Sequence, residues 1–110
     1  QLEGGIAQGV GYALYERLEI NPRSRRTLSS DLLHYRIPQM ADMPQTHVDM
    51  VDSYDPYGPL GAKSVGELAT VPVAPAIVNA ARRASGREIN SLPLCDRFVI
   101  LPSRRKEEDG

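Results

Sequence analysis

The segment from Leu2 to Glu16, LEGGIAQGVGYALYE, combines a helical pattern of apolar residues with four glycines. Glycine costs up to about 1 kcal/mol per helical position relative to alanine, so a helix with four glycines needs a compensating interaction. Gly5 and Gly9 are four residues apart and therefore share one face of such a helix. Close approach of the backbone to another surface is the usual reason for small residues on a helix face. We predict a tightly packed helix over about 2–16.

A second helix is predicted over about 72–85, within VPVAPAIVNAARRAS. Its prolines are confined to the first turns, where a missing N–H costs little. Two basic residues, Arg82 and Arg83, lie near its end, and Gly86 follows directly, as is typical of a helix C-terminus. The apolar face is formed by Val73, Ile77, Ala81 and Ala84.

The pattern elsewhere favours β structure. A turn signal, Asn21-Pro22-Arg23-Ser24, predicts a hairpin, and Thr46 to Val51 alternates with the period of two that is typical of a half-buried strand. The expected strands are Arg17 to Ile20, Thr27 to Tyr35, Thr46 to Val51 and Glu88 to Leu94. We therefore expect an α+β fold, a small mixed domain with two main helices (about 2–16 and 72–85) and several β-strands.

Composition narrows the functional classes. A length of 110 residues with 41% hydrophobic residues suits one domain with a modest core. The formal net charge of −1 gives no basic excess for nucleic acid or anionic lipid, and no apolar run approaches the roughly 20 residues of a membrane span. A single cysteine, Cys95, cannot supply an iron–sulfur cluster or an intrachain disulfide. The chain begins with Gln1 rather than Met, so we expect a segment of a longer protein.

The run Gly61 to Glu67, GAKSVGE, has three possible interpretations. A phosphate-binding P-loop requires lysine directly after the second glycine of GxxxxGK[ST], whereas Ala62 separates Gly61 from Lys63 here. A plain glycine-rich turn with a surface glutamate is the second interpretation. The third is a catalytic carboxylate, because Glu67 precedes a stretch of apolar residues that would desolvate it and suit it to proton abstraction.

Other reactive side chains favour structural roles. His34 and His47 lack the spacing of metal ligands, so we expect no metal-binding residues. Cys95, beside Pro93 and Leu94, is expected to be a small buried hydrophobe rather than a nucleophile.

Four segments in this order resemble the C-terminal part of the molybdopterin-binding (large) subunit of the xanthine oxidase / aldehyde oxidoreductase family of molybdenum hydroxylases. They are QLEGGIAQGVGYAL (1–14), HYRIP (34–38), GAKSVGE (61–67) and VPVAPAIVNA (71–80). The resemblance covers the chain from Gln1 to about Ile100. It implies that residues 1–102 are a C-terminal segment of a molybdopterin-binding domain, and the polar run 103–110 is expected to be a disordered tail.

The resemblance also implies a function. Such enzymes hydroxylate a carbon of an aldehyde or N-heterocycle with oxygen derived from water, and Glu67 would be the general base that activates a Mo–OH group. The cofactor-binding residues would be Gln1, Lys63, Ser64, Val65 and Gly66. Where many relatives have a proline after the glutamate, this chain has Leu68-Ala69.

Several partners follow from the same resemblance. The molybdopterin cofactor would be shared with the rest of the large subunit, and iron–sulfur clusters and possibly FAD would lie on other domains or subunits. By itself, the chain would be inactive. The alternative is a non-catalytic α+β interaction module that keeps the family fold. The compartment stays open, since a cytoplasmic and a periplasmic location both fit.

Overall fold

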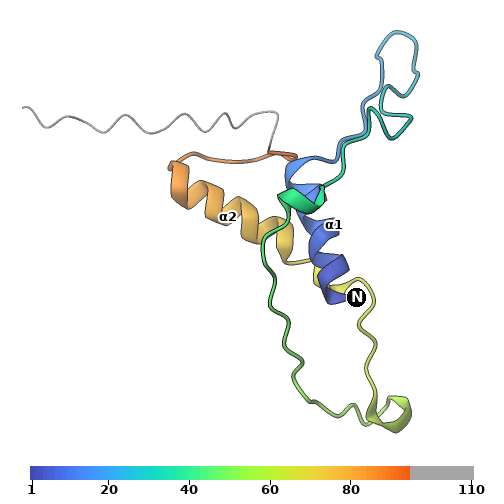
Figure 1. The fold of residues 1–110 in the computed structure, drawn as a ribbon, viewed down its shortest axis with the longest axis vertical. Coiled ribbons are helices and arrows are strands. Elements are labelled where there is room, and N and C mark those ends of the chain that lie inside the picture. The colour runs from blue at the N-terminus through green and yellow to red at the C-terminus, as the bar shows by residue number, and fades with distance from the viewer. Residues whose placement is uncertain (95–110) are drawn as a thin grey trace, which may run out of the picture.

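The computed structural model describes residues 1–94, and its centre is a pair of helices (Figure 1). Helix α1 spans Leu2–Leu14, and helix α2 spans Val73–Ser85. A short 3-10 turn, η3 (Leu68–Thr70), leads into α2, and α1 packs against both η3 and α2. Both predicted helices are confirmed. Gly86, with φ of 65°, ends α2, and its N–H donates to the carbonyl of Arg82 at 2.8 Å.

The glycines of α1 allow this close packing. Gly5 and Gly9 are both buried. A Cβ atom added to Gly5 would lie 2.7 Å from Cβ of Ala69, and one added to Gly9 would overlap the side chain of Val73. The predicted close approach is therefore confirmed, and the surface that α1 approaches is formed by η3 and the start of α2.

The core of the described chain is small. Its buried apolar side chains are Val10, Ala13, Ala69 and Leu94. The N–H of Leu94 donates to the carbonyl of Ala13 at 2.8 Å, which brings the segment after α2 back to the C-terminal end of α1. No side chain of α2 is fully buried, so the helix pair presents much of its apolar surface outward.

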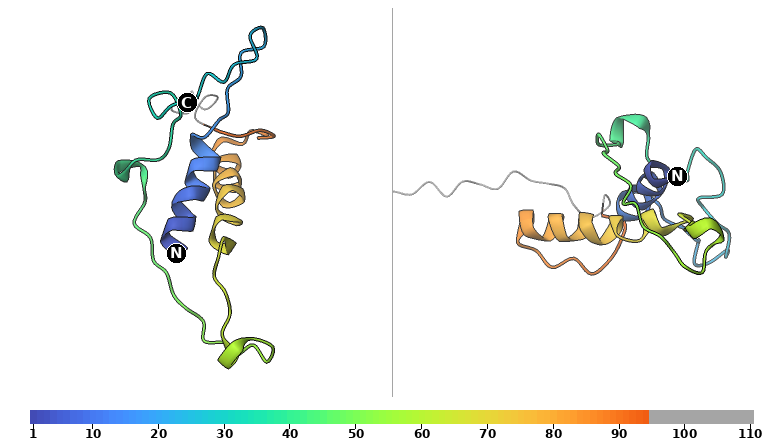
Figure 2. Two further views of the ribbon diagram at one scale, coloured as in Figure 1. Left: turned by 90° about the vertical axis from the view of Figure 1, so that its right-hand side faces the viewer. Right: turned by 90° about the horizontal axis from the view of Figure 1, so that it is seen from below.

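Two long excursions leave the helix pair in opposite directions (Figure 2). The first covers residues 15–39, and the second covers 43–67. Between them lies a 3-10 turn, η1 (Met40–Asp42), and the second excursion carries η2 (Pro59–Gly61) at its tip (Figure 1).

The expected α+β fold is wrong for residues 1–94, where no β-strand forms. The predicted hairpin is reduced to one antiparallel bridge between Ile20 and Thr27, and 46–51 and 88–94 adopt no regular structure. Alternation marks a chain that could be half-buried in a sheet, but a strand also needs backbone partners. The described chain supplies none for residues 46–51, and Met50 and Val51 are 75% and 89% exposed.

Large apolar side chains remain exposed on both excursions and on η1 between them, including Leu33, Met40, Val51 and Leu60. Among residues 1–94, no helix has the length and apolar character that a membrane span requires. Cys95 and the predicted polar tail at 103–110 lie outside the described residues.

Candidate functional site

Two predicted site segments, 65 residues apart in sequence, meet at the start of α1. The side-chain amide of Gln1 donates from Nε2 to the carbonyl oxygen of Gly66 at 2.9 Å. In Figure 1 the N-terminus lies beside the segment that returns from the second excursion toward α2. The fold thus brings the first residue of QLEGG to the residue just before Glu67.

The second excursion turns sharply before it reaches this point. Leu60 and Gly61 both have positive φ, 58° and 78°. The N–H of Asp55 donates to the carbonyl of Gly61 at 3.1 Å, and the ring of Tyr54 occupies the space where a side chain at position 61 would project. Glycine is therefore required at 61 both by backbone conformation and by space.

Around Glu67 the backbone makes a tight turn. Gly66 has φ of 46°, and Glu67 follows as the residue before η3 with φ of −96° and ψ of 6°. The N–H of Leu68 donates to the carbonyl of Val65 at 3.3 Å. Thr70 donates to the carbonyl of Glu67 from both its N–H, at 3.1 Å, and its hydroxyl, at 2.6 Å.

The side chain of Glu67 is exposed. The apolar residues that follow it do not cover it, since Leu68 and Val71 themselves are 55% and 72% exposed. The expected desolvation of Glu67 is therefore not met by residues 1–94 alone, and any wall that excludes water from this carboxylate has to come from elsewhere.

Three predicted site residues, Lys63, Ser64 and Val65, line an open hollow of about 530 Å³, here called the loop hollow. Its opposite side is the segment 49–53, which the sequence pattern did not single out as part of a site. Lys63 Nζ donates to Ser53 Oγ at 3.1 Å across it. The full lining is Leu2, Asp49, Met50, Val51, Asp52, Ser53, Lys63, Ser64, Val65 and Leu68.

The loop beside this hollow is rich in hydrogen-bond donors. Within residues 1–94, the backbone N–H groups from Ser64 to Glu67 have no acceptor. The ammonium of Lys63 and the hydroxyl of Ser64 add side-chain donors on the same segment. An array of free donors fits a ligand with many acceptor atoms, such as a phosphorylated pterin with its sulfur and oxygen groups. These residues therefore suit a molybdopterin.

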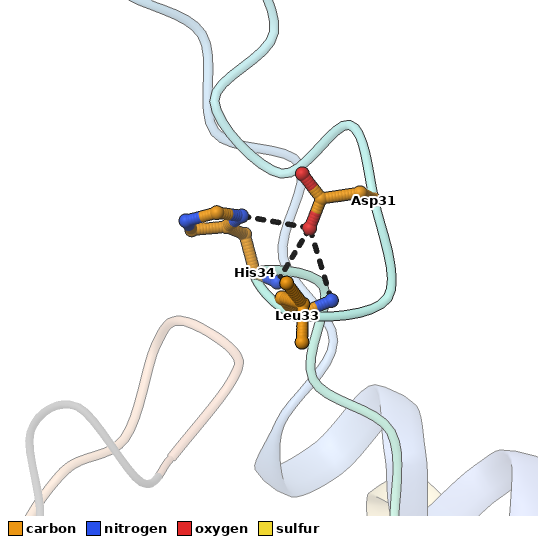
Figure 3. Close-up of polar contacts among 3 residues, drawn as sticks. All are labelled: Asp31, Leu33 and His34. Carbon is orange, nitrogen blue, oxygen red and sulfur yellow. Dashed lines mark hydrogen bonds and ion pairs between the residues drawn. The ribbon is translucent and has the colours of Figure 1, made fainter.

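Neither histidine lines the loop hollow. His34 belongs to a turn in the first excursion, where its Nδ1 lies 2.7 Å from Oδ1 of Asp31 (Figure 3). The same oxygen accepts the N–H groups of Leu33 and His34, at 2.9 and 3.1 Å. The hydrogen bond with the His34 ring is the main cause that lowers the pKa of Asp31. This carboxylate stabilises a surface turn.

His47 lines a neighbouring apolar groove between α1, the start of α2 and residues 44–49, which shares Leu2 and Asp49 with the loop hollow. Across the part of the chain that the structure describes, no three residues of the His, Cys, Asp and Glu types gather in a way that could hold a metal ion.

Comparison with known proteins gives the site its context. A family model described as "Molybdopterin cofactor-binding domain" matches residues 1–44. The xanthine dehydrogenase molybdenum-binding subunit of Escherichia coli O157:H7 is 42% identical over 108 residues, which are 98% of this chain and 14% of that protein. An aldehyde oxidoreductase molybdenum-binding subunit of Escherichia coli K12 is 36% identical over 95 residues, 86% of this chain and 13% of that subunit.

The isoquinoline 1-oxidoreductase subunit beta of Brevundimonas diminuta is 35% identical over 95 residues, 86% of this chain and 11% of its own length. The chain thus spans about one seventh of the curated relatives it matches, or less. The matches nevertheless extend over nearly all of the chain and agree in kind. This chain belongs to the xanthine oxidase / aldehyde oxidoreductase family and matches a segment of its molybdenum-binding subunits.

Proposed function

We propose that this chain forms one wall of the molybdopterin site of a molybdenum hydroxylase, and that Glu67 is the general base of the reaction. The observation that carries the proposal is the hydrogen bond from Gln1 to the Gly66–Glu67 peptide, because it joins two separate segments of the family resemblance directly before Glu67. The remaining walls, the iron–sulfur clusters and any flavin belong to the rest of the subunit and to its partners.

The loop from Lys63 to Gly66 holds the cofactor. Its unpaired N–H groups point to a role as donors toward acceptor atoms, and Lys63 contributes a positive charge to an anionic group. When bound, the molybdenum cofactor supplies the two-electron redox chemistry and the site at which oxygen derived from water is transferred. The relatives' names cover xanthine, an aldehyde and isoquinoline, so the substrate class proposed here is an aldehyde or an N-heterocycle.

Glu67 contributes a carboxylate at the end of that loop. An oxygen nucleophile attacks an electron-poor carbon faster when a base accepts its proton during the attack. The exposed carboxylate of Glu67 is accessible to a group outside this chain, and the two backbone carbonyls on either side of it are held by hydrogen bonds. Glu67 accepts the proton on a carboxylate oxygen and later returns it to solvent.

The test is Glu67→Gln in the complete enzyme. Glutamine keeps the shape of the side chain but cannot act as the base, so turnover should fall by about 10²- to 10⁴-fold. Molybdenum and pterin content should be unchanged, because the substitution leaves the loop backbone intact. Turnover at full cofactor loading measures the effect.

Glu19→Gln is the matched control, because Glu19 is an exposed glutamate on the first excursion whose side chain is remote from the loop hollow. It should keep parental turnover. A fully loaded Glu67→Gln enzyme that turned over within about threefold of the parent would contradict the proposal, since that effect is worth less than about 1 kcal/mol of barrier.

A further inference from the structure

We infer that Gln1 is a positioning residue for Glu67: its side-chain amide fixes the peptide group that precedes the carboxylate. This inference rests on the proposed function of Glu67. The role differs from the cofactor contact that the resemblance implies for Gln1, because the acceptor of its amide is a protein carbonyl.

The geometry around Glu67 supports this role from both sides. Gln1 Nε2 donates to the carbonyl of Gly66 at 2.9 Å, and that carbonyl belongs to the peptide joining Gly66 to Glu67. The next peptide is held by Thr70, whose N–H and hydroxyl both donate to the carbonyl of Glu67. Both peptides that define the direction of the Glu67 Cα–Cβ bond are therefore restrained.

The donor itself is anchored. The carbonyl of Gln1 accepts the N–H of Gly5 at 2.9 Å, which places Gln1 at the start of α1. One turn further along, α1 packs at Gly5 against Ala69, which belongs to η3 directly after Glu67. Helix α1 thus acts as a platform that holds the loop before Glu67 through Gln1 and the turn after it through Gly5.

The loop needs such a restraint. Gly66 adopts φ of 46°. Because glycine can adopt many other backbone conformations at little cost, it does not hold this one by itself. The carboxylate of Glu67 has no hydrogen bond or ion pair within residues 1–94, so within this part of the chain only the backbone, through the Cα–Cβ bond, restrains where the side chain can reach. Because a base must lie within hydrogen-bond reach of the proton it accepts, a small rotation of this peptide would reduce proton transfer.

The experiment replaces Gln1 by Met in the complete subunit within the assembled enzyme. Methionine has a similar length but no donor. We expect kcat to fall about tenfold, because one hydrogen bond that positions Glu67 is lost, and KM to change less than twofold. Molybdenum and pterin content should stay at the parental level. Gln8→Met, which removes an exposed glutamine of the same helix, should change none of these.

A second readout does not depend on turnover. Hydrogen exchange of the amides of Leu68 and Thr70, which donate within the Glu67 turn, should become about tenfold faster in the Gln1 variant and stay unchanged in the Gln8 variant. If the Gln1→Met variant lost pterin while hydrogen exchange in this turn stayed unchanged, the inference would be overturned, because Gln1 would then act on the cofactor directly.

The double variant tests whether Gln1 acts through Glu67. Placed on top of Glu67→Gln, Gln1→Met should change turnover by less than about twofold, because the base it positions is already absent. An additional tenfold loss would show an independent role and overturn the inference. Parental turnover of Glu67→Gln alone would instead overturn the proposed function, while faster exchange in Gln1→Met would still show that Gln1 restrains the turn.

Discussion

Gly66 is the residue on which the shape of the candidate site depends most. Its φ of 46° strains any L side chain, whereas the nearest atom to an added Cβ is Ser64 Oγ at 3.7 Å. Within residues 1–94 there is therefore room for a side chain at position 66, and glycine is required there only because of the backbone conformation. A group from outside the chain can approach its backbone.

Gly66→Val in the complete enzyme should lose molybdopterin more than stability. The side chain strains the turn by about 1–2 kcal/mol and adds bulk to the loop that is proposed to hold the cofactor. Gly86→Val is the matched control, because Gly86 also has positive φ, 65°, and an added Cβ there meets nothing within 4 Å. It should cost similar stability with full cofactor content. Normal molybdenum occupancy and turnover in Gly66→Val would mean that Gly66 is only a turn residue.

The sequence located the candidate site residues only in part. Gln1 could be connected with Gly66 only through the family resemblance, since no local pattern pairs residues 65 positions apart, and the structure brings these two together. The segment 49–53 went unrecognised because Asp52 and Ser53 carry no motif, and only the fold places them opposite Lys63. The exposure of Glu67 was also missed, because burial depends on which chain covers a residue.

At the scale of elements, α1 depends on its small residues for contact with η3 and α2. Gly4 and Gly9 provide a matched pair on this helix. Nothing lies within 4 Å of a Cβ added to Gly4, whereas one added to Gly9 meets the Val73 side chain.

Gly4→Ala should stabilise α1 by about 0.5–1 kcal/mol, because alanine loses less backbone entropy on folding. Gly9→Ala should destabilise the helix pair by about 1–3 kcal/mol, because the added methyl group separates α1 from α2. Hydrogen exchange of the α1 amides in the complete subunit measures both changes in stability. Exchange should be slower in Gly4→Ala and faster in Gly9→Ala than in the parent. Equal effects of the two substitutions would contradict the packing described for α1.

The helices could be predicted because their signals are local. The repeat of apolar residues, the early prolines and Gly86 all act within one element, and α1 and α2 form where expected. The strands could not, because a strand forms only with a partner. Thr46 to Val51 carries the alternation of a strand without any neighbouring chain to pair with in residues 1–94.

At the scale of the whole molecule, residues 1–94 enclose little apolar surface. Their core holds few buried apolar side chains, while Leu33, Met40, Val51 and Leu60 are each at least 85% exposed. Deep cofactor sites are built from several walls, whereas residues 1–94 line the open loop hollow with 49–53, 63–65, Leu2 and Leu68. We therefore expect the functional unit to be a much larger particle.

The size and metal content of the native particle that contains this chain test the central claim most directly. We predict a large complex with molybdenum and molybdopterin in stoichiometric amounts, measured by light scattering together with elemental and pterin analysis of the protein from its own source. A stable small protein without molybdenum would contradict the claim and would favour a non-catalytic interaction module that keeps the family's sequence pattern.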